Sequence, residues 1–83
     1  MSFYWLSFCD PAKSPGTQFL GACALRAESL EEALRRSHKM GINPGGEVAS
    51  LGPVPDAQVP VDFPINRLLQ RHEIPDAMSQ QEF

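Results

Sequence analysis

The chain has 83 residues, of which 42% are hydrophobic and 20% are charged, and its formal net charge is −3. This length supports one hydrophobic core and one domain, and the composition excludes a chain that is disordered throughout. The excess of acidic residues disfavours nucleic-acid binding, which depends on Lys and Arg side chains that neutralise phosphates.

Residues 3–9 form an apolar run that predicts the first β-strand. The run is too short to span a bilayer and lacks the preceding Lys or Arg of a signal peptide. We therefore expect a cytoplasmic protein that does not bind membranes. Apolar residues fall on both faces of the strand, with Trp5 on one face and Leu6 on the other. A strand of this kind belongs in the middle of a sheet that is covered on both sides.

A stretch rich in Pro and Gly, residues 10–18, predicts a hairpin that leads into a second strand over residues 19–26. A hairpin centred on this stretch places Ala22 beside Trp5, so that a small side chain faces a large one. This complementarity favours close packing of another layer on the sheet.

The two cysteines are expected to be reduced. The same register places Cys9 beside Gln18 and Cys23 beside Tyr4, which separates the two thiols by more than a disulfide tolerates. We therefore expect both side chains to be buried and chemically inert.

Ser29 and Glu32 form the capping-box pattern that begins a helix, which we predict over residues 29–40. Charged residues lie on one side of this helix and a mainly apolar stripe lies on the other. The stripe consists of Leu30, Ala33, Leu34, Ser37 and Met40. The pattern predicts an amphipathic helix that packs on the sheet.

The Gly-rich residues 41–46 follow the helix. Gly41 suits the left-handed position of a helix C-cap, and Ile42 is the apolar contact that commonly accompanies such a cap. Residues 43–45 fit a type II turn and lead into a third strand over residues 47–51. Phosphate-binding glycines precede a helix N-terminus, whereas these follow a C-terminus, so we interpret the stretch as a structural turn.

Four prolines fall within residues 53–64 and predict an extended strap. A short helix is expected to follow, with Asp62 near its cap and with Ile65, Leu68 and Leu69 on one face. Residues 53–75 would complete the domain, and residues 76–83 are expected to form a mobile tail.

These elements predict an α+β fold, with a β-β-α-β core in residues 1–52. The sheet has three mainly antiparallel strands with the first strand in the centre, and strands two and three are parallel to each other. One helix covers only one face of such a sheet. The Pro-rich C-terminal arm, a second copy or a different partner could cover the other face.

The chain lacks the residue patterns of common catalytic and metal sites. No CxxC or HxxxH spacing is present, so no metal or cofactor is expected. His38 and His72 are the available general bases, and no spacing links either of them to Cys9 as a nucleophile. We therefore expect no catalytic residues.

The sequence favours a small non-enzymatic protein–protein interaction module, such as a regulator, inhibitor or adaptor, acting on a protein partner or as a homodimer. It would act through an exposed apolar sheet face, a sheet edge or the C-terminal arm. The alternative is a small-ligand-binding protein or minor enzyme, with an aromatic pocket between the sheet and the C-terminal arm. Partner identity, oligomeric state and the exposed face of the sheet stay open. The residues expected to contact a partner or ligand are Tyr4, Trp5, Phe8, Phe63, Arg67, Leu68 and Arg71.

Overall fold

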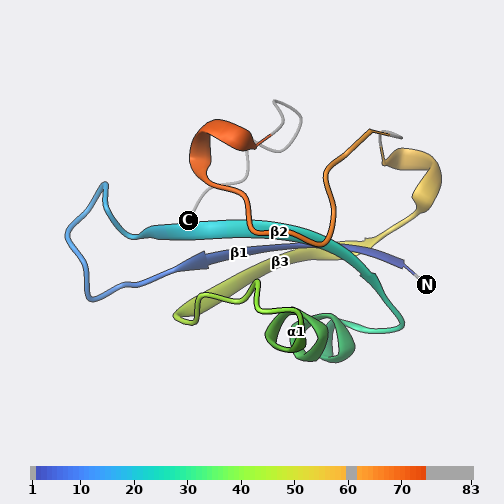
Figure 1. Cartoon of the computed structure of the whole chain (residues 1–83), viewed down its shortest axis with the longest axis horizontal. Helices are drawn as coiled ribbons and strands as arrows, with labels where there is room; N and C mark the ends of the chain where they lie inside the picture. The colour runs from blue at the N-terminus through green and yellow to red at the C-terminus, as the bar shows by residue number, and fades with distance from the viewer. Residues whose placement is uncertain (1, 60–61, 75–83) are drawn as a thin grey trace.

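A computed structural model describes residues 2–59 and 62–74 and confirms the α+β fold class (Figure 1). The 76–83 segment, predicted to be a mobile tail, lies outside the described residues. None of the helices in the described ranges is long and apolar enough to cross a membrane. The regular elements are β1 (Ser2–Cys9), β2 (Phe19–Ala27), α1 (Leu30–Lys39) and β3 (Glu47–Val54), with short 3-10 helices η1 (Asp56–Gln58) and η2 (Arg71–Glu73).

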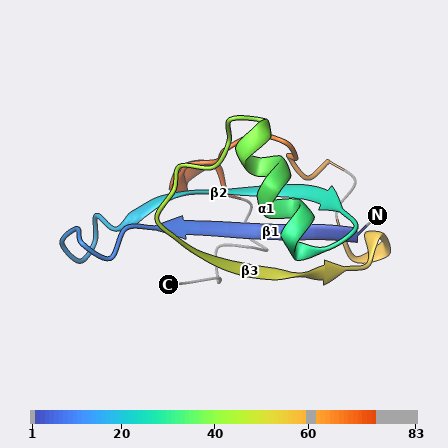
Figure 2. The same ribbon diagram turned by 90° about the horizontal axis from the view of Figure 1, so that it is seen from below.

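The strand order is β2-β1-β3, and β1 runs antiparallel to both neighbours. Strands β2 and β3 are therefore parallel to each other, and α1 connects them by crossing one face of the sheet (Figure 2). The central position of β1 explains why its residues from Phe3 to Cys9 are all buried. The topology is the one predicted from the sequence.

The predicted register of the β1–β2 hairpin is wrong by two residues. Trp5 lies opposite Ala24 rather than Ala22, and Leu6 lies opposite Cys23. Cys9 lies opposite Phe19 rather than Gln18, which shifts the register by one residue, and the bulge between Phe8 and Cys9 shifts it by a second residue. A shift of two residues keeps every side chain on its predicted face, so the layers are unaffected.

Helix α1 begins as the capping pattern predicts. The Oγ atom of Ser29 accepts a hydrogen bond from the backbone N–H of Glu32 at 3.1 Å. The Glu32 carboxylate in turn accepts the N–H of Glu28 at 2.9 Å, one residue before the cap. Ala33 and Ser37 lie fully buried against the sheet, while Leu30 and Met40 at the two ends of the stripe are exposed.

The turn after α1 is held by backbone geometry and one side chain. Gly41 has a φ of +72°, and the N–H of Ile42 donates to the carbonyl of Ser37 at 3.0 Å, which confirms the predicted C-cap. The Oδ1 atom of Asn43 accepts the N–H of Gly45 at 2.8 Å. The Asn43 amide also donates to the buried hydroxyl of Ser37 at 3.0 Å, which ties the turn to the helix.

The described part of the C-terminal arm, residues 62–74, covers the second face of the sheet. The short helix predicted there, from near Asp62 to before Pro75, is absent apart from the 3-10 turn η2. Leu69 exchanges backbone hydrogen bonds with Ala22 at 2.6 and 2.9 Å, and the N–H of Asn66 donates to the carbonyl of Ala24 at 2.8 Å. Asn66 has a φ of +62°, which no right-handed helix accommodates. The outer edge of β2 therefore satisfies backbone groups that a helix would have satisfied internally.

Two apolar clusters lie on opposite faces of the sheet. The cluster under α1 contains Tyr4, Leu6, Phe8, Cys23, Leu25, Ala27, Ala33 and Ile42. The cluster under the arm contains Phe3, Trp5, Ala22, Ala24, Phe63 and Leu69. The arm of the same chain thus covers the sheet face opposite α1. From the sequence, a second copy or a different partner was an alternative cover for this face.

Gly45 and Gly46 provide a matched test of the turn, because both have positive φ, +85° and +75°. A Cβ on Gly45 would meet nothing within 4 Å, whereas one on Gly46 would collide with the backbone carbonyl of Cys9. We expect Gly45→Ala to lower the free energy of unfolding by about 1 kcal/mol, from backbone strain alone. Gly46→Ala should lower it by at least about 3 kcal/mol in urea titrations. Equal losses would contradict this account.

Candidate functional site

The four aromatic residues predicted to contact a partner or ligand do not come together. Tyr4 and Phe8 pack under α1, whereas Trp5 and Phe63 pack under the arm. The rings of Trp5 and Phe63 meet edge to face with their centroids 5.7 Å apart. All four side chains are buried, so they contribute to the two cores rather than lining one pocket.

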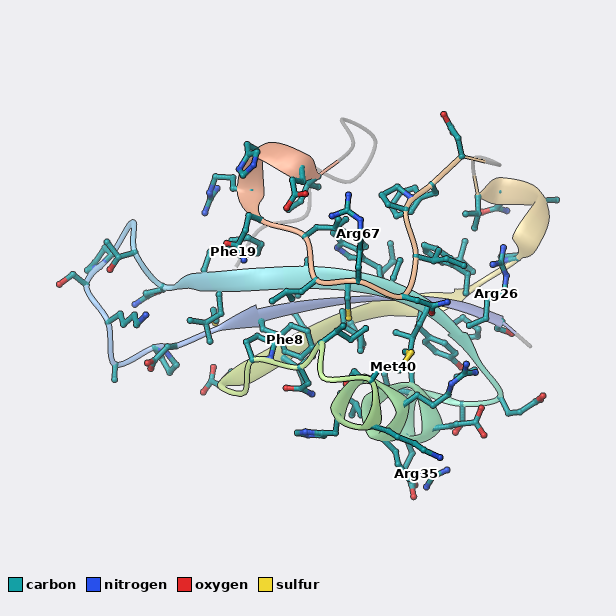
Figure 3. The ribbon with its side chains drawn as sticks, in the orientation of Figure 1. Phe8, Phe19, Arg26, Arg35, Met40 and Arg67 are labelled. Carbon is teal, nitrogen blue, oxygen red and sulfur yellow. The ribbon has the colours of Figure 1, made fainter. Side chains whose placement is uncertain are left out.

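The two arginines of the arm contact their own chain. The Arg67 guanidinium lies 2.8 Å from the Glu73 carboxylate, and that of Arg71 lies 5.1 Å from the centre of the Phe19 ring. The hydrogen bond from Arg67, followed by one from the Gln70 backbone N–H, lowers the pKa of the Glu73 carboxyl. In Figure 3, Arg67 lies on the arm side of the sheet and Phe8 on the α1 side. A role of these arginines in partner contact remains a prediction, as it does for half-buried Leu68.

Both cysteines are free and buried, as predicted. Cys23 lies opposite Leu6 beneath α1, and burial raises the pKa of its thiol to about 11. His38 and His72 are exposed, on α1 and η2 respectively. Among residues 2–59 and 62–74, no group of three or more His, Cys, Asp or Glu side chains is placed to hold a metal ion.

The outer edge of β3 is the feature that the fold leaves unpaired within the described sheet. The direction of the backbone groups of β3 can be derived from Ala22 on β2. The N–H and C=O of Ala22 form hydrogen bonds with Leu69 of the arm and therefore point away from β1. Ser7 lies opposite Ala22, so the backbone groups of Ser7 point to β3, where Ala49 is their partner. Alternation along β3 then directs the N–H and C=O of Val48 and Ser50 outward.

The side chains around this edge leave it open. All residues from Glu47 to Pro53 are exposed, and the larger apolar ones, Val48 and Leu51, are 41% and 39% exposed. Natural sheet edges are commonly protected by charges, proline or a bulge. On β3 such features occur only at the ends, with Glu47 at the start and with Pro53 and the register irregularity at the end. The residues between them carry no charge, proline or bulge. The opposite sheet edge differs, because the arm pairs with β2 there (Figure 1).

Residues of β3 are not among the contact residues predicted from the sequence, although the sequence carries a signal for them. A sheet with its first strand in the centre places the third strand at an edge. Residues 48–52 contain no charge and no proline. Together these two observations predict an unprotected edge strand.

One polar atom beneath the arm has no partner. The Nε1 atom of Trp5 is buried and finds no hydrogen-bond acceptor in the described part of the chain. A buried N–H without an acceptor costs about 1–3 kcal/mol. The indole N–H is therefore a polar group that a ligand could satisfy.

The raised pKa of Cys23 predicts a pH-dependent stability. Burial disfavours the thiolate, so the pKa rises from 9.0 in the unfolded chain to about 11 in the fold. The contribution of the neutral Cys23 thiol to the free energy of unfolding is fully present below pH 9. It is lost as the pH rises from 9 to 11, at up to about 1.4 kcal/mol per pH unit. In urea titrations across this range, the wild-type protein should lose up to about 3 kcal/mol more than Cys23→Ala. Parallel pH profiles would refute this assignment.

No protein-family model matches the chain, and no curated protein or solved structure is significantly similar to it. The function proposed next is inferred from the residues and geometry described above.

Proposed function

We propose that this protein is a non-enzymatic protein–protein interaction module that binds an extended strand of a partner along the outer edge of β3. The observation that carries the proposal is the outward direction of the Val48 and Ser50 backbone groups in an exposed stretch, residues 48–52, that contains no charged residue. A strand added at this edge would extend the three-stranded sheet. A regulator, inhibitor or adaptor could each use this mode of binding.

Main-chain hydrogen bonds would supply part of the affinity. Each bond between the edge and a partner strand replaces bonds to water and contributes about 0.5–1.5 kcal/mol net. The side chains of Val48 and Leu51 project on opposite faces of the sheet, because they lie opposite Phe8 and Trp5. A partner strand with apolar residues at alternate positions would place them on one face of the sheet and cover one of these two side chains.

The edge is held in place before any partner binds. Val48, Ala49 and Ser50 all lie in regular register with β1, which is buried in the middle of the sheet. The strand begins next to Gly46, whose backbone lies against the carbonyl of Cys9. Binding therefore costs little ordering of the edge strand itself. The cytoplasmic location predicted from the sequence is part of this proposal.

Site-specific photo-crosslinking in the native cell tests the proposal. A photoreactive residue at Leu51 reports on the edge, and one at Leu30 is a matched control, because both side chains are apolar and 39% exposed. We expect adducts from position 51 and not from position 30. Ser50→Pro should abolish them by removing an outward N–H that β1 does not use. Absence of adducts at position 51, or equal adducts with Ser50→Pro, would overturn the proposal.

A second candidate, small-ligand binding between the sheet and the arm, is favoured by the unpaired indole N–H of Trp5. A ligand that accepts this hydrogen bond should raise the melting temperature of the wild-type protein. Trp5→Phe keeps an aromatic ring without the N–H and is the matched control. A screen of metabolites by thermal shift tests the idea, since a ligand at 100 times its Kd stabilises by about 2.7 kcal/mol. No shift in the wild type, or equal shifts in Trp5→Phe, would reject it.

A further inference from the structure

We infer that the strand bound at this edge is β3 of a second copy of the chain, paired antiparallel about a two-fold axis at Ala49. The inference rests on the proposed function, because it names the partner of the same edge. In this arrangement Val48 lies opposite Ser50 of the second copy, and Ser50 lies opposite its Val48. The two sheets join into one sheet with β3 at its centre.

The backbone of β3 suits this register. Val48 and Ser50 direct their N–H and C=O groups outward, and a two-fold axis at Ala49 pairs them with each other. Every outward group of these residues then has a partner. Ala49 itself directs its backbone groups to Ser7 within its own chain, so the two copies of Ala49 meet as a close, non-hydrogen-bonded pair.

The irregular end of β3 excludes a register whose axis is displaced by one residue toward the C-terminus. A two-fold axis at Ser50 would require Gly52 to pair with Val48 and Pro53 to lie beside Glu47. The ladder with β1 is interrupted between Trp5 and Phe3, where Gly52 lies close against the Tyr4 backbone. Pro53 has no N–H to donate. The regular part of the edge therefore ends before Gly52, and an axis at Ala49 uses all of that regular part.

Charge favours the antiparallel arrangement of two copies. Glu47 is the one charged residue of β3. Antiparallel pairing about Ala49 places it beside Leu51 of the second copy, so the two Glu47 positions are separated by about 13 Å along the strands. At physiological ionic strength this exceeds the screening length of about 8 Å. A parallel pairing in register would place the two carboxylates side by side, where they repel each other.

The side chains are complementary without large rearrangement. On the arm face, the small Ala49 residues meet at the axis and Leu51 covers the aliphatic part of Glu47 from the second copy. On the α1 face, Val48 lies beside Ser50. Val48 and Leu51, the exposed large apolar residues of β3, both gain contacts. The interface is narrow, so the dimer should be weak and dependent on concentration.

Sedimentation velocity of the purified chain, from micromolar to millimolar concentration, measures this self-association. We expect a monomer–dimer equilibrium for the wild type and for Ser50→Ala, which keeps the backbone N–H. Ser50→Pro should remain monomeric, since its ring removes that N–H. Both variants should fold, because Ser50 directs no backbone group to β1. Circular dichroism and urea titration check this. A monomeric wild type at all concentrations, or a dimer that Ser50→Pro leaves intact, would overturn the inference.

Cysteine crosslinking tests the position of the axis. Ala49→Cys places two thiols in a close, non-hydrogen-bonded pair, at a Cα separation of about 4.5 Å that permits a disulfide. Leu51→Cys lies on the same face, but its copies are about 13 Å apart and should not be crosslinked. We expect mild oxidation to give a covalent dimer of Ala49→Cys only. Crosslinking of Leu51→Cys instead would overturn the register.

The failure of this inference can be distinguished from failure of the proposed function. If the purified chain stays monomeric while position 51 forms adducts with a different protein in the cell, the self-pairing is wrong and the edge-binding function stands. If position 51 forms no adduct in the cell and the chain stays monomeric, both are wrong.

Discussion

Strand β1 carries apolar side chains on both faces, and the rest of the structure follows from the need to bury both. Tyr4, Leu6 and Phe8 lie beneath α1, while Phe3 and Trp5 lie on the opposite face. A small sheet with one crossover helix buries only one of these sets. The C-terminal arm supplies the other layer, with Phe63 edge to face against both Phe3 and Trp5. The arm is therefore part of the hydrophobic core, and a domain without it would expose an aromatic surface.

The arm reaches this position because β2 leaves room for it. A Cβ on Gly21 would lie 2.8 Å from the Leu68 side chain, so a larger residue would displace the arm from the edge. The absence of that side chain lets Leu68 pass around β2 and pack toward the α1 cluster, while Leu69 enters the opposite cluster. The arm thus connects both cores across one edge of the sheet. Its polar contacts, such as the Arg67–Glu73 pair, are exposed and contribute little by comparison.

The elements with local sequence signals were predicted correctly. The prediction for the arm was wrong, because its conformation depends on hydrogen bonds to the edge of β2, which is distant in the sequence. The Ser29 cap, the left-handed Gly41 and the two-sided hydrophobicity of β1 were sufficient for the helix, its end and the strand order. The Ile65, Leu68 and Leu69 spacing fits a helix in isolation. In the fold, the outer edge of β2 provides backbone partners for Asn66 and Leu69 instead. The β1–β2 register depended on a bulge beside Gly21, which has a φ of +136°, and a glycine in a strand does not by itself specify how far the register shifts. The open β3 edge could be predicted only by combining the strand order with the uncharged residues that follow Glu47.

The pairing of the arm with β2 also bears on how many copies the proposed pairing through β3 could join. A sheet with two open edges can add further sheets at both ends, which is the geometry of a fibre. Here the edge beyond β2 is occupied by residues of the same chain. The proposed association through β3 would therefore join two chains and leave the arm beside β2 at each end of the combined sheet. The arm would in this way limit the proposed assembly to two copies of the chain.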